Sequence, residues 1–117
     1  MLVNKTDWEQ RVSDAWASMD QRSEADFLAR IGNLAAELPP DTGVGIFERA
    51  SSLDSTGHSD LAVPLYRQAL ERGLAGERRR RAVIQLASSM RNLGRPEESV
   101  ALLTTELDAG FPHLSPP

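Results

Sequence analysis

Apolar residues recur along most of the chain at intervals of three or four positions, the spacing of one face of an α-helix. None of these stretches shows the strict alternation expected of a half-buried β-strand. The predicted helices cover approximately residues 6–19, 23–38, 42–55, 59–70, 76–93 and 96–108. The pattern therefore predicts an all-α protein, an array of about three antiparallel helix hairpins.

Several residues predict where these helices begin. Thr6 with Glu9 three positions later is a capping-box pair, which predicts the start of the first helix. Ser23, followed by acidic residues, predicts the start of the second helix. Pro64 lies about one turn into the fourth helix, which predicts either a kink or a later start near Leu61.

The central part of the chain contains an internal sequence duplication. A shift of 37 residues places residues 49–74 on residues 86–111 with eight identities and no gap. A period of this size is typical of stacked supersecondary units. Each copy has an apolar helical stripe, a glycine and a second stripe, and a glycine there suits a left-handed helix end. The halves of the duplication are therefore predicted to be helix–turn–helix units.

These two copies resemble the tetratricopeptide repeat (TPR) family, which has a repeat of 34 residues containing an A-x3-F segment. In the first copy the matching positions are Ile46, Ala50, Leu53, Ala62, Tyr66 and Ala69. In the second copy the matches are Ala87, Met90 and Gly94, whereas Ser99 and Leu103 replace the alanine and the aromatic residue. The closing proline is missing from both copies, and we place the three surplus residues in the link 73–79. The resemblance implies a fragment of a right-handed α-solenoid.

The predicted organisation is a single TPR-like domain over residues 1–117. It comprises a degenerate N-terminal hairpin (1–40), a first repeat (41–75), a second repeat (76–110) and a tail (111–117). A shift of 34 residues places Trp16 on Ala50 and Gly32 on Tyr66. Relative to the first repeat, the N-terminal hairpin would then have a large residue in place of a small one on its first helix and a small residue in place of a large one on its second. Together the two exchanges would conserve the volume of the hairpin interior.

Composition narrows the class of protein. The chain has no cysteine, so it can form neither disulfides nor thiolate metal sites, and we expect a protein of the reducing cytoplasm. A net charge of −4 argues against a general nucleic-acid binder. No apolar run approaches the ~18 residues that indicate a membrane span, and the first residues lack a signal-peptide core.

The sequence offers little for catalysis. The segment 54–57 (Asp-Ser-Thr-Gly) is similar to the loop of aspartic proteases, but that chemistry needs two such loops, and this one lies at a predicted helix end. His58 and His113 have no metal-binding spacing, and no nucleophile elbow is present. We therefore expect no enzymatic activity, no cofactor and no metal.

The TPR resemblance implies that the first helix of each pair lines a concave groove. The lining positions it implies are Val44, Phe47, Ser51, Asp54 and Ser55 in the first copy, and Arg81, Ile84, Ser88, Arg91 and Asn92 in the second. Phe47 suits either a groove anchor or the core, and we favour the core. The second set is predicted to grip a carboxylate. The expected function is a non-catalytic interaction module that binds a peptide or protein segment.

A run of four arginines, Arg78, Arg79, Arg80 and Arg81, opens the fifth predicted helix. Positive charge there opposes the helix dipole, so the run invites a functional explanation. The alternative function is binding of an anionic ligand or nucleic acid, although no aromatic platform accompanies the run and nucleic acid is the less favoured partner. The structural alternative is a solvated face whose arginines pair with nearby acids such as Glu77.

The last predicted helix carries more apolar surface than one neighbour can cover. Its apolar positions are Val100, Leu102, Leu103 and Leu107. The last unit of a solenoid needs a polar outer face, and no capping helix follows in this chain. The apolar surface must therefore meet Phe111 and Leu114 of the tail, a second protomer or a partner protein, and we expect a homodimer through this end.

Overall fold

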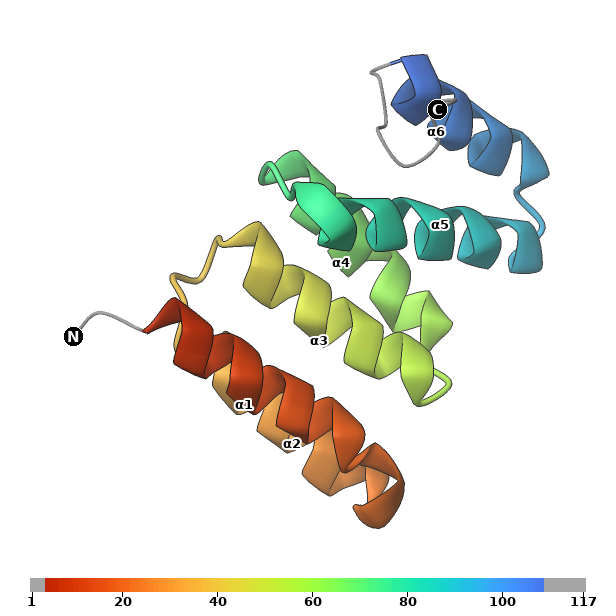
Figure 1. Ribbon diagram of the computed structural model, residues 1–117. Helices are drawn as coiled ribbons and strands as arrows, with labels where there is room; N and C mark the ends of the chain where they lie inside the picture. Colours follow the sequence, from red (N-terminus) through yellow and green to blue (C-terminus); the bar gives the residue numbers. More distant parts are fainter. Residues whose placement is uncertain (1–3, 109–117) are drawn as a thin grey trace.

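The computed structural model of the protein describes residues 4–108. Its elements, in chain order, are α1 (Lys5–Ala17), a 3-10 turn (Met19–Gln21), α2 (Glu24–Ala35), α3 (Gly43–Ser55), α4 (Ser59–Glu71), α5 (Gly76–Asn92) and α6 (Pro96–Asp108). The helices form three successive hairpins, with α1 and α3 in front of α2 and α4 in Figure 1. The predicted all-α array of hairpins is confirmed. The predicted tail lies outside the described residues.

The start of α1 differs from the prediction. The helix begins at Lys5, and the side chain of Asn4 accepts a hydrogen bond from the backbone N–H of Asp7 at 2.9 Å. The predicted capping box of Thr6 and Glu9 is therefore wrong, because Asn4 supplies the cap two positions earlier.

The predicted start of α2 is confirmed, whereas the later start considered for α4 is not. Ser23 caps α2 as predicted, since its hydroxyl accepts from the backbone N–H of Asp26 at 3.1 Å. The predicted later start of α4 near Leu61 is wrong, because the helix begins at Ser59 and continues through Pro64.

The duplication in the sequence is also a duplication of backbone geometry. Gly57 and Gly94, which are 37 residues apart, follow α3 and α5 with φ values of +88° and +79°. In both copies the backbone N–H of the residue after the glycine donates a hydrogen bond to a carbonyl near the end of the helix. His58 donates to Leu53 at 2.8 Å, and Arg95 donates to Met90 at 2.7 Å. A left-handed residue closed by such a bond is a standard helix end, and its positive φ favours glycine in both copies.

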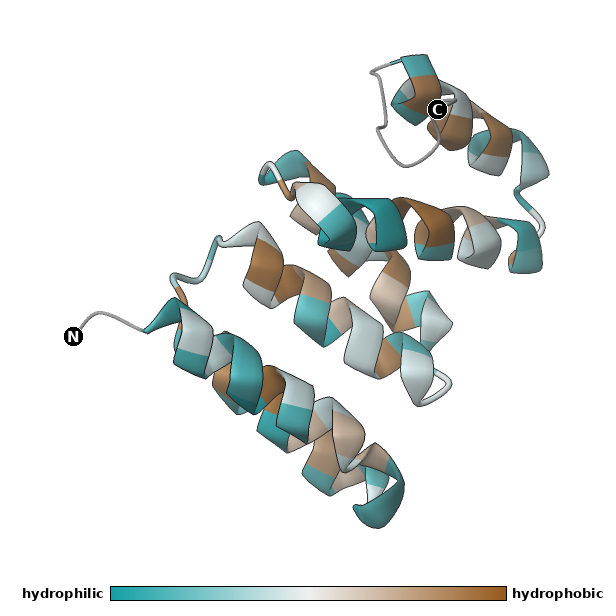
Figure 2. Ribbon diagram, in the orientation of Figure 1, coloured by the Kyte–Doolittle hydropathy of each residue, from teal (hydrophilic) through white to brown (hydrophobic). Residues whose placement is uncertain are grey.

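Two apolar clusters form the core. The first lies within and between the duplicated hairpins and contains Ala50 and Tyr66, which are 0% and 1% exposed. The second holds α1 against α2, and Val44 of α3 packs on both clusters. Ala50 and its counterpart Ala87 are both buried, so helices approach closely at the same place in each copy. The apolar positions lie mainly where helices face one another (Figure 2).

The N-terminal hairpin does not contain the predicted volume exchange. The small residue in its interior is Ala15, which is 0% exposed, and a Cβ built on Gly32 would meet nothing within 4 Å. Trp16 faces α3 instead, where its indole N–H donates to Glu48 at 2.7 Å. Its ring also meets that of Phe27 edge-on, with centroids 5.1 Å apart. Ala15 is thus the small residue in the hairpin interior, and Trp16 packs at its edge, between Phe27 of α2 and Glu48 of α3.

Ala75 offers a test of how α5 begins. It is the N-cap residue, in an extended conformation (φ −132°, ψ 172°) that suits a capping side chain, but alanine has none to offer. Ala75→Asp is expected to stabilise the protein by about 1 kcal/mol, because a carboxylate at the N-cap can accept from the backbone N–H groups of the first turn and interacts favourably with the helix dipole. The melting temperature should rise by about 4 °C in thermal unfolding followed by circular dichroism. Ala75→Asn separates the hydrogen bond from the charge, and no gain in either variant would contradict the prediction.

Candidate functional site

Three adjoining hollows lie along α1, α3 and α5, and together we call them the groove. The polar hollow, about 190 Å³, is lined by Trp16, Phe47, Ser51, Asp54, Ser55, Tyr66, Arg81 and Gln85. The middle hollow, about 440 Å³, shares Trp16 and Arg81 with it. The apolar hollow, about 480 Å³, shares Glu9, Glu77 and Arg78 with the middle one. The shared walls make the hollows one continuous surface.

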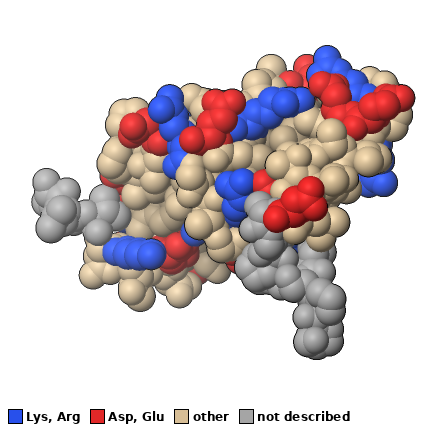
Figure 3. Space-filling model, turned by 90° about the horizontal axis from the view of Figure 1, so that it is seen from above, with Lys and Arg blue, Asp and Glu red and all other residues tan. Residues whose placement is uncertain are grey.

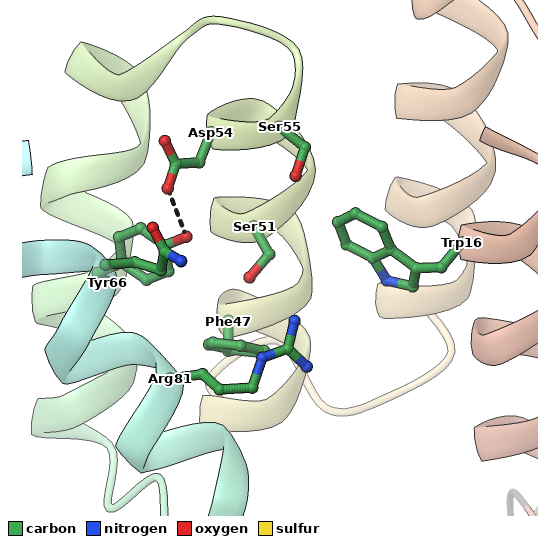
Figure 4. Close-up of a pocket in the computed structure, with 8 residues that line it drawn as sticks. Trp16, Phe47, Ser51, Asp54, Ser55, Tyr66 and Arg81 are labelled. Carbon is green, nitrogen blue, oxygen red and sulfur yellow. Dashed lines mark hydrogen bonds between the residues drawn. The ribbon is translucent and has the colours of Figure 1, made fainter. Parts of the chain in front are cut away.

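An aspartate held by two hydroxyl groups forms one wall of the polar hollow. The Tyr66 hydroxyl donates to one carboxylate oxygen of Asp54 at 3.0 Å (Figure 4), and the Ser59 hydroxyl donates to the other at 2.9 Å. Burial, together with the charge of Asp54, raises the pKa of Tyr66, so this phenol remains protonated. Asp54 therefore already uses both oxygens and acts as a fixed part of the wall.

Arg81 supplies the positive charge of the polar hollow. Its guanidinium carbon lies 5.7 Å from the centre of the Phe47 ring, in a cation–π arrangement. Figure 4 shows the guanidinium directed from α5 toward the space between Ser51 and Trp16. The side chain is exposed, so its N–H groups face a place that a ligand can reach. A guanidinium beside two serine hydroxyls is suited to bind an anionic group.

Arg78 ties three helices together at the boundary between the middle and apolar hollows. Its Nε donates to Glu48 of α3 at 3.0 Å, and its two terminal nitrogens donate to the carboxylate of Glu9 on α1. Its guanidinium also lies over the ring of Trp8, 5.7 Å from the centroid. Glu48 is only 4% exposed and also accepts the indole N–H of Trp16. This network fixes the position of α5 relative to α1 and α3.

The Glu9–Arg78 pair predicts a loss of stability in acid. The hydrogen bond from Arg78 lowers the pKa of Glu9 below 4.5 in the folded protein. A lowered pKa stabilises the folded state above the unfolded pKa, and this stabilisation is lost as the pH falls through the folded pKa. In urea titrations the wild type should exceed Glu9→Gln in stability at neutral pH, and the difference should shrink below pH 4.5. A difference that is constant with pH would contradict this.

The four arginines predicted as a basic patch have different surroundings. Arg79 donates to both oxygens of Glu106, at 2.6 and 3.1 Å, and Glu106 is only 6% exposed. Arg80 lies 3.5 Å from Glu77, one of the acids predicted to pair with the run. Seen from above, basic and acidic side chains lie next to one another (Figure 3). The run therefore contributes mainly tertiary ion pairs, and Arg81 is the member that faces the polar hollow.

Six of the ten predicted lining residues line the groove, five of them around one hollow. Those around the polar hollow are Phe47, Ser51, Asp54, Ser55 and Arg81, and Val44 lines the apolar hollow. The other predicted positions, which do not line these three hollows, are Ile84, Ser88, Arg91 and Asn92. Ten residues of helix, about 15 Å, separate Arg81 from Arg91, so the two do not converge on one carboxylate. Phe47 is 1% exposed, which confirms its assignment to the core.

Sequence reasoning missed four of the residues that shape the groove: Trp16, Glu48, Tyr66 and Gln85. Gln85 could have been predicted from helix periodicity, because it lies four positions after Arg81 on the same face. Trp16 and Tyr66 were assigned to hairpin interiors. Tyr66 does lie in the core at 1% exposure, but its hydroxyl reaches the hollow. Nothing in the local sequence indicated that Glu48 would be buried.

Residues 4–108 contain no group of three or more His, Cys, Asp or Glu side chains arranged to hold a metal ion. Within the same residues, no helix combines the length and apolar character required to cross a membrane.

The chain matches a known protein family. A family model described as a tetratrico peptide repeat matches residues 43–115, a span that begins with the first residue of α3 and includes α6. Neither the curated proteins nor the solved structures yielded a match.

Proposed function

Because the chain belongs to the tetratricopeptide repeat family, whose members are generally protein–protein interaction modules, we propose that it binds a peptide segment in the groove without catalysing a reaction. The observation that supports this most strongly is the continuity of the hollows. Trp16 and Arg81 form walls of two of them, so one extended ligand can contact both. An extended chain advances about 3.3 Å per residue, so several residues fit along the groove.

The side chains of the groove suit a peptide ligand. Arg81, Ser51 and Ser55 offer hydrogen-bond donors to carbonyl or carboxylate oxygens. Trp16 offers a half-buried aromatic surface, the type of residue that contributes most at interfaces. Glu48, which accepts from Arg78, holds the indole of Trp16 in place before binding, and this reduces the entropy lost on association.

A display library of random nine-residue peptides, selected on the full chain, tests the proposal. Selected peptides should bind wild-type protein and lose about tenfold in affinity with Arg81→Gln, through the loss of charge-assisted hydrogen bonds. Arg91→Gln is the matched control, because it removes the same charge from the same helix outside the three hollows. Equal effects of the two substitutions, or a library without binders, would count against the groove as the binding site.

We further propose self-association through α6, as a homodimer. The duplication supports it: Val63 on α4 is 6% exposed where α5 covers the hairpin, whereas the equivalent Val100 on α6 is 63% exposed. Leu107 on the same helix is 51% exposed, and no later helix lies within the described part of the chain to cover either side chain. Apolar positions of α6 are brown in Figure 2. The opposite end of the array is polar, with Arg11 paired to Glu37, which favours a closed α6-to-α6 contact over head-to-tail stacking.

Light scattering at high micromolar concentration distinguishes a homodimer from a monomer. The wild type should have the mass of a dimer, and the pair Val100→Asp with Leu107→Asp should have that of a monomer. Leu61→Asp, an equally exposed leucine on α4, should remain dimeric. A monomeric wild type would remove the dimer proposal and leave the groove proposal unaffected.

A further inference from the structure

The polarity of the groove changes along its length. The surface of the polar hollow is mostly polar, the middle hollow is mixed, and the apolar hollow is mainly apolar. The walls of the apolar hollow include Leu38, Val44 and Ala75, which belong to three different segments of the chain. Such a gradient along one continuous surface matches a ligand whose own polarity changes along its length.

The apolar hollow lies where the N-terminal ends of α1, α3 and α5, the first helices of the three hairpins, meet. Val44 is in the first turn of α3, Ala75 immediately precedes α5, and Lys5 is the first residue of α1. Val44 is partly buried and already packs on the core, so it forms a firm wall, and Ala75 is exposed and small. With about 480 Å³, the hollow is large enough for one bulky side chain.

Charge complementarity defines the other end of the ligand. Arg81 points into the polar hollow, and the single carboxylate in its lining, Asp54, already accepts from Tyr66 and Ser59. Between the two ends Arg78 is held by Glu9 and Glu48, so its guanidinium offers no unpaired charge to a ligand. The groove therefore favours an apolar group at one end and an acidic group at the other.

We propose that the segment bound in the groove carries a large apolar residue, which occupies the apolar hollow, and an acidic residue three or four positions away, which pairs with Arg81. This rests on the proposed function and specifies its ligand. The spacing follows from helix geometry: Trp8 and Trp16, which line opposite ends, are eight helical residues or about 12 Å apart. An extended chain covers that distance in three or four residues.

Ala75→Asp gives a sharp test, because it places a charge on the wall of the apolar hollow while adding a cap to α5. It should weaken binding of the library-selected peptides about tenfold, although the protein itself becomes more stable. Loss of affinity then cannot arise from unfolding. Leu61→Asp is the matched control, an exposed apolar residue changed to aspartate on α4, and it should leave binding unchanged. The selected sequences should be enriched in leucine, isoleucine, methionine or phenylalanine three or four positions from aspartate or glutamate.

The outcomes separate this inference from the proposed function. Peptides weakened by Arg81→Gln but unaffected by Ala75→Asp, or selected without an apolar residue, would overturn the inference and leave the groove as the binding site. An absence of binders, or binding insensitive to both substitutions, would overturn both. Sensitivity to both substitutions together with the expected spacing supports both.

Discussion

Arg78→Ala is expected to destabilise the protein by about 3 kcal/mol. The substitution leaves the carboxylate of Glu48 buried, with a side-chain exposure of 5%, and without its cation. An uncompensated buried charge costs far more than an exposed one, because water no longer stabilises it. Glu9 loses its partner as well, and the contact over the ring of Trp8 disappears. Urea unfolding followed by circular dichroism measures the loss.

Arg80→Ala is the matched control for Arg78→Ala. It removes the same side chain from the same helix, but its ion pair with Glu77 is exposed and should contribute no more than about 0.5 kcal/mol. The double variant Arg78→Met with Glu48→Gln should recover most of the lost stability. It removes both charges and keeps an oxygen to accept the indole N–H of Trp16. Equal losses for Arg78→Ala and Arg80→Ala would show that the network is not an important part of the fold.

Ala50→Leu is expected to destabilise the protein by about 2 kcal/mol. Ala50 is 0% exposed in the cluster within and between the repeats, so a larger side chain must push helices apart or adopt a strained rotamer. Its counterpart Ala87, 2% exposed, should respond in the same way, because the two copies use the same contact. Thermal and urea unfolding of both variants measure the effect.

Ala29→Leu provides the comparison for these two variants. Ala29 is exposed on α2, so leucine there adds the same atoms without crowding a neighbouring helix. Its stability should remain within about 0.5 kcal/mol of the wild type. If Ala50→Leu and Ala87→Leu are tolerated as well as Ala29→Leu, the close approach of helices is not what these alanines provide.

The helices and the duplication were accessible from the sequence because both depend on local rules. The 3.6-residue period of apolar positions fixed the number and class of elements, and Gly57 and Gly94 marked equivalent helix ends. The predicted N-terminal exchange involving Trp16 failed because the register depends on which residue of α1 faces α2. Trp16 and Ala15 are adjacent, and a rotation of one position decides between them. That rotation is set by contacts with α2 and α3, which a single helix does not contain.

The candidate site likewise combines features that were predicted from the sequence with features that depend on tertiary contacts. The TPR resemblance implied Phe47, Ser51, Asp54 and Ser55 as lining positions, and the structure places these four residues of α3 around one hollow. The pairing of Arg78 with Glu9 joins residues 69 positions apart, and no local pattern links them. The expected convergence of Arg81 and Arg91 did not arise, because ten residues along a helix set them about 15 Å apart.

By itself, the sequence determined the helical class and the repeated unit, because periodicity and turn residues act within a few positions. The tertiary structure alone decided that Arg78 and Arg79 pair with buried carboxylates while Arg81 faces the groove. Four arginines in a row are chemically identical, and each points in a different direction around the helix. Only the neighbouring helices, α1, α3 and α6, determine what each of them meets.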